Sequence, residues 1–221
     1  MVATPIGNLQ DISLRALDTL KSVELIIAED TRVTRKLLSK FEIKTPLESY
    51  HQHSSIEKKL YILNKILNGE NIALVTDAGT PGISDPGNEL VDFLISSTSE
   101  KLDILPIPGA SSLTAVLSVC GFDVGVFLFL GFLAKKDTLI DLDIVKNSKC
   151  SVVYYDSPFR VLKNLEKLID FVGPDRRVLV SFELTKMFEK HFRGKISEVL
   201  ETLKKESNLK GEVVVVVEKG A

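Results

Sequence analysis

Carboxylate, hydroxyl and basic side chains gather in four short stretches of this 221-residue sequence, each rich in glycine or proline or rich in charge. The stretches are ATPIGNLQD at 3–11, EDTRVTRK at 29–36, TDAGTPGISDPG at 76–87 and PIPGASS at 106–112. Glycine and proline fix tight turns that let the backbone approach a ligand, while Ser, Thr and Asp supply directional hydrogen bonds. A single stretch of this kind is usually only a turn. Four of them, each at the end of a predicted strand, indicate a ligand site at one sheet edge.

The residue types in these loops favour a ligand with hydroxyl groups or a positive centre over a ligand with phosphates. Neither G-x-G-x-x-G nor G-x-x-x-x-G-K-[ST] occurs in the sequence. Asp77 and Asp85 would repel phosphates, but they would accept hydrogen bonds from a ribose or an amino group. We therefore expect an adenosine-type ligand without phosphates. A metal-dependent hydrolase using these two carboxylates is the least favoured alternative, because the loops supply too few ligands, and we predict no metal site.

Strand and helix patterns alternate in the first half of the chain, which is typical of an α/β fold with a mostly parallel sheet. The predicted strands lie at 23–29, 71–76 and 102–107. Helical spacing predicts a helix over 54–67 behind a serine cap. Its expected apolar face comprises Ile56, Leu60, Leu63, Ile66 and Leu67. Further helices are expected to begin near Pro86, as a first helical position, and near Ser111.

The pattern changes after residue 132 to helix, strand and helix, followed by RVLVSFE, HFRG and the β-branched run GEVVVVVEK. This order predicts a mixed sheet in an α+β domain. We expect the domain boundary in the polar stretch around residues 135–137, so that the domains are 1–132 and 133–221.

Composition limits the class of protein. Twenty-eight Lys and Arg against thirty Asp and Glu give a net charge of −2, so no overall basic field indicates nucleic acid, although a local patch is not excluded. Cys120 and Cys150 form no disulfide framework or metal-ligand spacing, and Cys120 is expected to be a buried free thiol in a reducing, cytoplasmic setting. The longest apolar run, 124–134, is too short to span a bilayer, and MVATPIGN does not have the pattern of a signal peptide. We expect no membrane partner.

Nine stretches in a fixed order resemble one known family. They are VATPIGNLQDISLRAL, AEDTRVTRKLL, YHQH, LVTDAGTPGISDPG, PIPGASS, FLFLGF, YYDSPFR, ELTK and KGEVVVVVE, and they span nearly the whole chain. As a set they resemble the tetrapyrrole-methylase-like enzymes that use S-adenosylmethionine, and the first, second and fourth are similar to the branch that methylates ribosomal RNA. The resemblance implies two α/β domains with the donor in the cleft between them. It also implies a homodimer that methylates the ribose 2′-oxygen of a cytidine in the decoding region of 16S RNA in the small ribosomal subunit.

The resemblance also implies, position by position, which residues bind S-adenosylmethionine. In the loops of the first half these are Ile6, Asp77, Ala78, Gly79, Thr80, Ile83, Ser111 and Ser112. In the second half they are Tyr155 or Asp156, together with Gly211 and Glu212. Asp85 has the alternative role of capping the helix that follows it.

Methyl transfer to a ribose hydroxyl requires that the hydroxyl lose its proton at or near the transition state. A general base at hydrogen-bond distance would therefore increase the rate by roughly two to four orders of magnitude. Glu29 and Asp30, at the end of the second strand, are the candidate bases. A helix cap is the alternative role for Asp30.

Basic side chains near the loops are the candidate RNA contacts, because Arg and Lys orient an RNA backbone through its phosphates. They are Arg15, Arg32, Arg35, Lys36, His51, Arg160 and Lys186. A solvated helix face is the alternative for the cluster at 32–36, and an ordinary surface or core histidine is the alternative for His51 and His53. The scarcity of Tyr and Trp favours an RNA that the ribosomal subunit has already shaped.

Two other functions are compatible with the same loops. One is an enzyme of the same fold that methylates a tetrapyrrole or another small molecule, and the other is a non-catalytic module that binds adenosine-like ligands. The basic stretch EDTRVTRK favours RNA over the first alternative. Phe159 stands where the family commonly has His, which argues against an indispensable proton carrier at that position.

Overall fold

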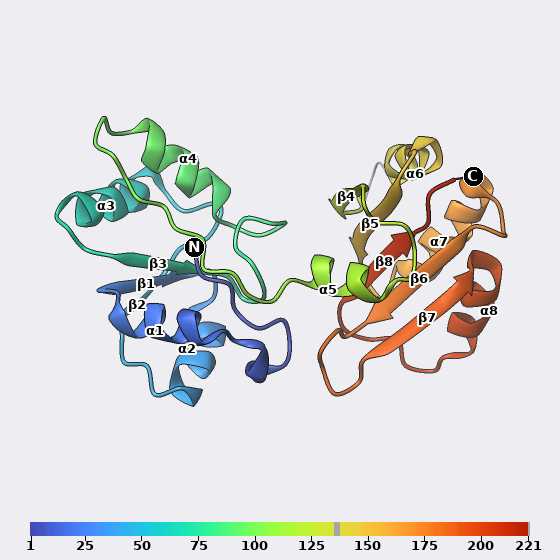
Figure 1. Ribbon diagram of the computed structural model, residues 1–221, viewed down its shortest axis with the longest axis horizontal. Coiled ribbons are helices and arrows are strands. Elements are labelled where there is room, and N and C mark those ends of the chain that lie inside the picture. The colour runs from blue at the N-terminus through green and yellow to red at the C-terminus, as the bar shows by residue number, and fades with distance from the viewer. Residues whose placement is uncertain (135–137, 221) are drawn as a thin grey trace. The chain divides into compact units, whose positions relative to one another are not determined.

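The computed structural model describes residues 1–134 and 138–220, and the chain divides into two compact units, Met1–Ser111 and Ser112–Ala221 (Figure 1). The two units correspond in number to the two expected domains. Their boundary, however, lies before residue 112, whereas the sequence placed it in the stretch 135–137, which is outside the described residues.

The first unit is built on a parallel sheet with the strand order β2-β1-β3. Its strands are β1 (Leu25–Ala28), β2 (Leu47–Ser49) and β3 (Ile72–Val75). The central strand β1 pairs in parallel with both neighbours, so the carboxyl ends of these strands meet at one edge. The predicted strands at 23–29 and 71–76 and the parallel sheet are confirmed.

Helices cover both faces of this sheet (Figure 1). They are α1 (Leu14–Ser22) and α2 (Thr31–Lys40) on one face and α3 (Ile56–Leu67) and α4 (Asn88–Ser96) on the other, preceded by a 3-10 turn, η1 (Leu9–Asp11). The alternation of side chains along β1 shows why both faces need cover. Ile26 and Ala28 pack in the cluster with α1 and α2, whereas Leu25 and Ile27 pack in the cluster with α3 and α4.

Helix α3 forms where the spacing predicts it, with Ser55 as its cap, but the expected apolar face is partly wrong. Ile62 and Leu63 are buried, whereas Ile56 and Leu60 are 52% and 45% exposed. The apolar residues of α3 are spaced so that either of two neighbouring faces of the helix could have been the buried one. The face that is buried includes Lys59, whose ammonium group pairs with Glu89 on α4. The aliphatic stem of Lys59 can pack in the core while its charge is paired, which sequence periodicity does not reveal.

The strand expected at 102–107 is also wrong. This segment makes only an isolated parallel bridge, between Ile107 and Val2. The neighbouring segment at the start of the chain turns from Val2, next to Ile107, to Thr4, next to Gly79, so no regular ladder develops. A cavity of ≈ 260 Å³ lies among β3, α3, α4 and residues 103–107.

The second unit is built on a mixed sheet with the strand order β4-β5-β8-β6-β7. The strands are β4 (Phe127–Phe132), β5 (Ser151–Asp156), β6 (Arg177–Phe182), β7 (Lys190–Lys195) and β8 (Val213–Val217). Strand β8 is antiparallel to both β5 and β6, which gives the mixed sheet that the sequence predicted. All residues of β8 are buried, as a run of β-branched valines in a central strand requires.

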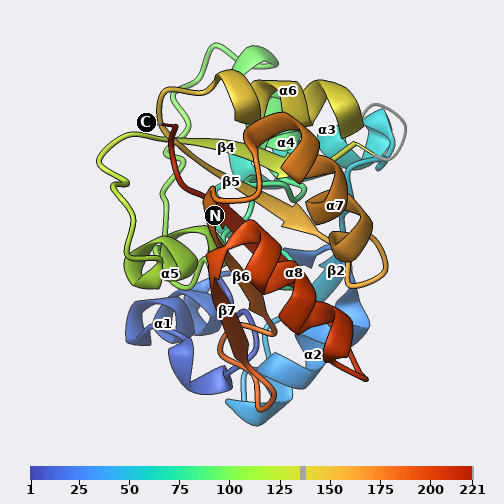
Figure 2. The ribbon, with the colours of Figure 1, turned by 90° about the vertical axis from the view of Figure 1, so that its right-hand side faces the viewer.

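Helices cover one face of the second sheet, where α7 (Val161–Val172) and α8 (Ile196–Lys205) lie in front of it in Figure 2. Together with α6 (Thr138–Asn147) they share one core cluster with the sheet, and α5 (Ser112–Val119) packs against β8. Strand β4 belongs to this unit because it pairs with β5. The polar composition after residue 132 therefore marks a connection inside the second unit.

Two smaller observations complete the fold. Within residues 1–134 and 138–220, every helix is too short or too polar to cross a membrane. Cys120 is buried and Cys150 is half-buried, and both are free thiols, as expected for Cys120.

The core of the second unit gives a stability prediction. Replacing Leu165 on α7, which is fully buried, with alanine should lower the free energy of unfolding by about 2–5 kcal/mol, because the change leaves a cavity. Leu14→Ala is the control, because Leu14 is 80% exposed and its loss should cost less than about 0.5 kcal/mol. Urea denaturation of the intact chain measures both, and equal losses would contradict the described core.

Candidate functional site

Backbone hydrogen bonds join the loop at 3–11 to the loop at 76–87. The Thr4 amide donates to the Gly79 carbonyl at 2.9 Å, and the Gly79 amide donates to the Thr4 carbonyl at 3.1 Å. The Thr4 hydroxyl also donates to the Thr76 carbonyl at 3.2 Å. Thr4 therefore holds both loops at the carboxyl edge of the first sheet, although no role was predicted for it.

The loop at 106–112 is tied to the same place. The Thr80 hydroxyl donates to the Ala110 carbonyl at 3.2 Å. Gly79 has a φ of +84°, and a Cβ there would lie 3.2 Å from Cγ2 of Ile6 and 3.6 Å from the Ala110 carbonyl oxygen. Glycine is therefore required both for the backbone conformation and for the close approach of these loops.

The loop that follows β1 joins this group through one contact. The Asp30 amide donates to Oδ1 of Asp77 at 3.1 Å. Glu29, Asp30 and Asp77 thus lie close together. The two candidate bases are therefore next to Asp77, one of the residues predicted to bind the methyl donor.

Asp30 is fully engaged by its own helix. Its carboxylate caps α2 by accepting from the Arg32 amide at 2.8 Å, and it also accepts from Nε and Nη2 of Arg32, the latter at 2.6 Å. These hydrogen bonds lower the pKa of Asp30 to about 2. A carboxylate that holds its proton so weakly is a poor general base.

Glu29 has the opposite electrostatic environment. Burial raises its pKa, and the neighbouring charge of Asp77 raises it further. Burial is also the main cause of a raised pKa at Asp77, with a smaller contribution from the charge of Asp30. Two neighbouring carboxylates favour protonation of one of them, and Glu29 is the half-buried member of the pair, so Glu29 is a better proton acceptor than Asp30.

Tyr50 and His51 follow β2 at the same sheet edge. Tyr50 is buried, its pKa is raised to about 12 by burial, and its hydroxyl makes no hydrogen bond to any described residue. His51 and His53 are exposed.

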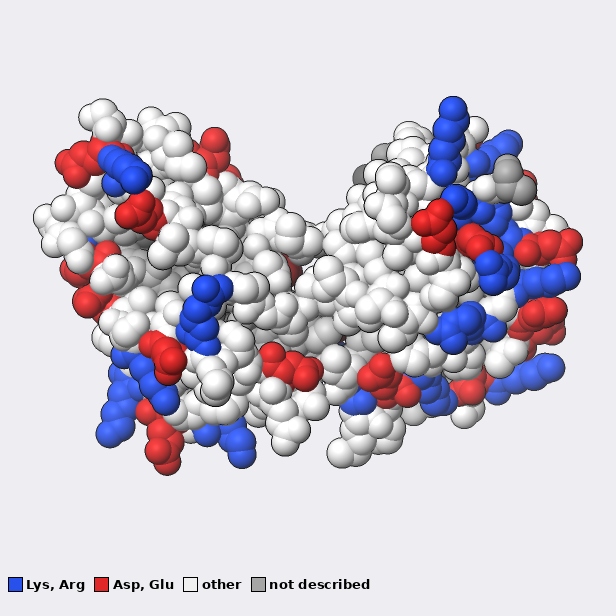
Figure 3. Space-filling model, viewed as in Figure 1, with Lys and Arg blue, Asp and Glu red and all other residues white. Residues whose placement is uncertain are grey.

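The basic candidates of the first unit are accessible. Arg32 has a side chain that is 88% exposed although it pairs with Asp30, and Arg35 and Lys36 lie on the exposed side of α2. Arg15 is exposed and donates to the Pro106 carbonyl at 3.5 Å. On the face of the molecule that Figure 3 shows, Lys and Arg side chains are interspersed with Asp and Glu, in keeping with the small net charge.

At the second unit's sheet, strands β4, β5 and β6 end at the edge where β8 begins. Ser112, at the start of α5, donates its hydroxyl to the Tyr155 hydroxyl at 2.9 Å. The ring of Tyr155 lies between Phe129 and Phe132 of β4, with centroid distances of 5.0 and 5.2 Å. Two of the predicted donor-binding residues, Ser112 and Tyr155, are thus in direct contact.

Asp156 and Arg160 hold each other in the interior of the second unit. The Asp156 carboxylate has no exposed surface, and it accepts from Asn164 at 2.8 Å and faces Arg160 at 3.4 Å. Burial raises the pKa of Asp156. Arg160 also donates to the Leu133 carbonyl at 3.2 Å. These contacts hold Asp156 within the second unit, so of the two predicted residues Tyr155 stays the candidate for donor binding.

Glu183 organises the loops before β8, and no role was predicted for it. Its Oε1 accepts from the Glu212 amide at 2.9 Å and from Lys186 at 2.8 Å, and Lys186 also reaches Glu212 at 3.0 Å. Burial opposes ionisation of Glu183, but the hydrogen bonds from Lys186 and Glu212 outweigh it, so its pKa is lowered. The signal in the sequence was the glutamate that opens ELTK, ahead of the KGE stretch.

Gly211 is the residue that makes this arrangement sterically possible. Its φ is +85°, and a Cβ at this position would overlap the Glu183 carboxylate. Lys186 is thus already paired with two carboxylates, in contrast to the exposed Arg32.

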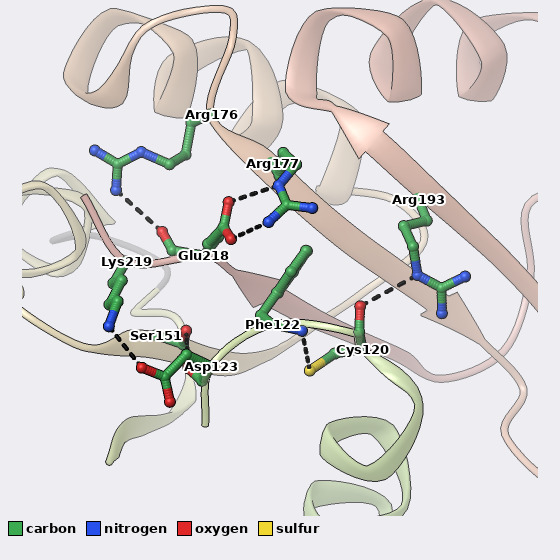
Figure 4. A network of polar contacts seen from close by, with 9 residues as sticks. All are labelled: Cys120, Phe122, Asp123, Ser151, Arg176, Arg177, Arg193, Glu218 and Lys219. Atoms are coloured by element: carbon green, nitrogen blue, oxygen red, sulfur yellow. Dashed lines mark hydrogen bonds and ion pairs between the residues drawn. The ribbon is translucent and has the colours of Figure 1, made fainter. Parts of the chain in front are cut away.

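A network of polar contacts fixes the far end of α5 (Figure 4). Arg193 on β7 donates to the carbonyls of Val119 and Cys120, and its Nε lies 3.2 Å from the latter. Cationic side chains near a helix C-terminus satisfy its last carbonyls and complement its dipole. Because Ser112 is bonded to Tyr155 at the other end, α5 is held at both ends.

The segment after α5 is fixed by the same network (Figure 4). The Arg177 guanidinium lies 5.3 Å from the ring centroid of Phe122 and pairs with Glu218, and Lys219 pairs with Asp123 at 2.6 Å. Among the described residues, no three His, Cys, Asp or Glu side chains come together in a way that could hold a metal ion.

The chain matches a known family over most of its length. The family described as Tetrapyrrole (Corrin/Porphyrin) Methylases matches residues 1–200. The chain is 43% identical over 221 residues to the Ribosomal RNA small subunit methyltransferase I of Bacillus subtilis, covering 99% of this chain and 74% of that protein. It is 41% identical to the protein of the same name from Thermotoga maritima, covering 98% of this chain and 96% of that protein.

Solved structures with the same fold are more distant in sequence. A cobalt precorrin-4 methyltransferase superimposes with a TM-score of 0.71 at 17% identity, covering 98% of this chain and 92% of the other. A uroporphyrin-III C-methyltransferase from Thermus thermophilus, solved with S-adenosyl homocysteine, gives a TM-score of 0.63 at 19% identity, covering 97% and 94%. These likenesses establish the two-unit α/β fold.

Gly211 gives a test of the second unit's loop arrangement. Gly211→Ala should destabilise the protein by forcing Ala into a conformation with positive φ and by displacing the Glu183 carboxylate. Gly173→Ala is the matched control, because Gly173 has a φ of +82° with open space around the added Cβ. The control should cost about 1–3 kcal/mol for backbone strain alone. Thermal unfolding measures both, and equal shifts in Tm would contradict the contact with Glu183.

Proposed function

Because this chain belongs to the tetrapyrrole (corrin/porphyrin) methylases, we propose that it transfers a methyl group from S-adenosylmethionine to the ribose 2′-oxygen of a cytidine in 16S ribosomal RNA. The protein is a methyltransferase, as its family and its relatives are. The RNA acceptor is supported by relatives at 41–43% identity that are named for ribosomal RNA and that align over nearly the whole chain. We further propose that the substrate is the small ribosomal subunit and that the enzyme is a homodimer in the cytoplasm, where ribosomes are.

One observation carries the proposal. Hydrogen bonds bring the loops at 3–11, 29–36, 76–87 and 106–112 to one edge of the first sheet. There they combine an exposed carboxylate, Asp77, with closely approaching backbone at Gly79 and a carboxylate of raised pKa, Glu29. This combination suits a positively charged donor with ribose hydroxyls and an acceptor hydroxyl that must lose a proton.

The donor contacts that we propose come from both units. They are Ile6, Asp77, Ala78, Gly79, Thr80, Ile83 and Ser111 from the first and Ser112, Tyr155, Gly211 and Glu212 from the second. When bound, S-adenosylmethionine supplies a methyl group on a sulfonium, which is a good leaving group. The residues present fit such a group, because Asp77 offers a carboxylate and Gly79 admits close backbone contact.

Alignment and proton removal are the tasks of the chain's own residues. Holding the acceptor oxygen in line with the methyl group can contribute about 7–11 kcal/mol. As the new carbon–oxygen bond forms and the carbon–sulfur bond breaks, the hydroxyl proton passes to the Glu29 carboxylate. Asp30 is unsuited to this step because Arg32 occupies its oxygens, so we assign it the role of helix cap.

The RNA backbone would be oriented by the exposed basic residues of the first unit. These are Arg15, Arg32, Arg35, Lys36 and His51. Arg160 and Lys186 were predicted for the same task, but both hold carboxylates within the second unit, so we propose that they position loops instead.

The proposed reaction can be tested by transfer of labelled methyl from S-adenosylmethionine to small ribosomal subunits that lack the modification. Free 16S RNA and a porphyrinoid precursor serve as parallel acceptors. We expect label at the 2′-oxygen of one cytidine of the subunit, located by nuclease mapping. Label in the porphyrinoid, or donor binding without any label in RNA, would contradict the proposed acceptor while leaving the fold assignment intact.

The general base can be identified from the pH dependence of single-turnover methylation. A carboxylate base works only when ionised, so the rate should fall as the pH drops through the raised pKa of Glu29. Glu29→Gln should lower the rate by about 10²–10⁴-fold and remove this acid limb. Asp30→Asn, which keeps a cap on α2, should retain most of the rate. Wild-type rates for Glu29→Gln would exclude it as the base.

A further inference from the structure

Two loops of the second unit expose large apolar side chains to solvent. Among the described residues, the most exposed large apolar side chains are those of Phe159 and Met187, at 93% and 91%, and Phe188 is 75% exposed. Single exposed apolar residues are common on protein surfaces and need no explanation. These three, however, all lie on the loops that follow β5 and β6. We call Phe159, Met187 and Phe188 the loop-tip residues.

The two loops leave the same edge of the second sheet. Asp156, at the end of β5, and Phe182, at the end of β6, both pair with Val213 of β8. Because β8 lies between these strands and neighbouring strands are about 4.7–4.9 Å apart, the loops begin roughly 10 Å from each other. The same edge carries Tyr155 and Glu212, which are among the proposed donor contacts.

Polar contacts hold the loop after β5 in place. The Arg160 amide donates to the Ser157 carbonyl at 3.0 Å. The Arg160 guanidinium lies 3.4 Å from the Asp156 carboxylate and donates to the Leu133 carbonyl at 3.2 Å. The exposure of Phe159 therefore does not come from a loop without contacts of its own.

The loop after β6 is fixed as well, and its backbone is strained. Lys186 pairs with Glu183, and the Thr185 amide donates to Oε2 of Glu189 at 2.8 Å. Glu183 and Thr185 have φ values of +50° and +65°, a conformation that residues other than glycine rarely adopt. Strain of this kind clusters at sites that bind ligands. Arg160 and Lys186, which position the two loops, thereby fix where the loop-tip residues lie.

We propose that the loop-tip residues bind unstacked nucleobases of the RNA substrate, beside the nucleotide that is methylated. This rests on the RNA acceptor proposed above and adds how that RNA is held. An aromatic ring can stack on any base, and RNA is recognised mainly through bases that are splayed out of a helix. Because Tyr and Trp are scarce in this chain, Phe supplies the rings.

The distance between the two loops agrees with a splayed strand. Neighbouring nucleotides of one strand in a duplex are about 3.4 Å apart along the axis. Loops that begin roughly 10 Å apart therefore contact bases that are not stacked on each other.

The area of the loop-tip residues favours bases over a protein partner. An aromatic side chain buries about 150–250 Å² when fully covered, so the three exposed side chains can bury only several hundred Å². A stable protein interface takes roughly 800 Å² from each partner. Partly exposed charged side chains also adjoin the loop tips, among them Arg160, Lys186 and Glu189. The core of a protein interface is depleted in such charges, whereas stacking on a single ring needs no large apolar surface.

Steady-state methylation of small ribosomal subunits that lack the modification tests the proposal. Phe159→Ala and Phe188→Ala should each raise the KM for the subunit by about 5–100-fold with kcat unchanged, because stacking on one ring is lost. Phe159→Trp should keep the wild-type KM, whereas Phe159→Leu, which is apolar but has no flat ring, should behave like Phe159→Ala. Calorimetry should give an unchanged Kd for S-adenosylmethionine in every variant.

Val126→Ala is the matched control. Val126 is 73% exposed, against 75% for Phe188, and it lies just before β4, at the opposite edge of the same sheet. Its loss should leave the KM unchanged. Thermal unfolding checks that each variant is folded, as expected for side chains that are so exposed.

Each outcome bears on the proposal. An unchanged KM in both alanine variants, while the wild-type protein methylates the subunit, would overturn it and leave the proposed function standing. Weaker donor binding in these variants would also overturn it, because the loop tips would then support the donor site. So would a raised KM accompanied by dissociation in sedimentation velocity, which would assign the loop tips to a contact between copies of the chain. A wild-type protein that methylates no RNA would contradict the proposed function, and this proposal with it.

Discussion

The reciprocal backbone hydrogen bonds between Thr4 and Gly79 hold together the loops that make up the first unit's site. Neither loop has a regular strand partner of its own, so each satisfies its backbone through the other. Gly79 can take part only because it adopts a positive φ and leaves room for Ile6. Once this pair is in place, Thr80 reaches Ala110, and Asp77 accepts from the amide of Asp30. Glycine, proline and hydroxyl side chains in these loops are thus needed for their mutual contacts, quite apart from any ligand.

A division of labour between adjacent carboxylates follows from this arrangement. Asp30 is hydrogen-bonded to Arg32 at the start of α2. These hydrogen bonds lower the pKa of Asp30, so its carboxylate stays ionised at pH values where an ordinary aspartate would be protonated. Glu29 precedes the helix, is partly buried beside Asp77, and has its affinity for a proton raised. Neighbouring residues of the same chemistry therefore acquire different tasks because only one of them lies where a helix needs a cap.

Local sequence patterns predicted where most helices and strands form. They predicted less well which residues those helices and strands pack or pair against. Strands β1 and β3, the serine cap of α3 and the mixed second sheet followed from periodicity, β-branched runs and capping chemistry, whereas the short strand β2 was not predicted. The buried face of α3 did not, because it depends on the pairing of Lys59 with Glu89. The strand at 102–107 failed because strand formation depends on the neighbour's path as well as on local composition.

The candidate site shows the same limit. The loops could be located because glycine and proline mark turns, whereas the state of each charged residue depended on partners distant in the sequence. Lys186 and Arg160 looked like free cations, yet they pair with Glu212 and Asp156. No role was predicted for Glu183, because its carboxylate packs directly against Gly211. A contact between residues so far apart in the sequence cannot be read from residue spacing.

In the first unit, residues 105–107 are hydrogen-bonded to Met1, and this contact has a consequence for the order of folding. The Ile107 amide donates to the Met1 carbonyl at 2.8 Å, and the Met1 amino group donates to the Leu105 carbonyl at 3.0 Å. Contacts between segments so far apart in sequence form slowly, and on the ribosome they must wait until the later segment has emerged. The second sheet needs only pairings within 127–217. During synthesis the first unit would therefore stay open, with its loops unassembled, until roughly half of the chain has been made.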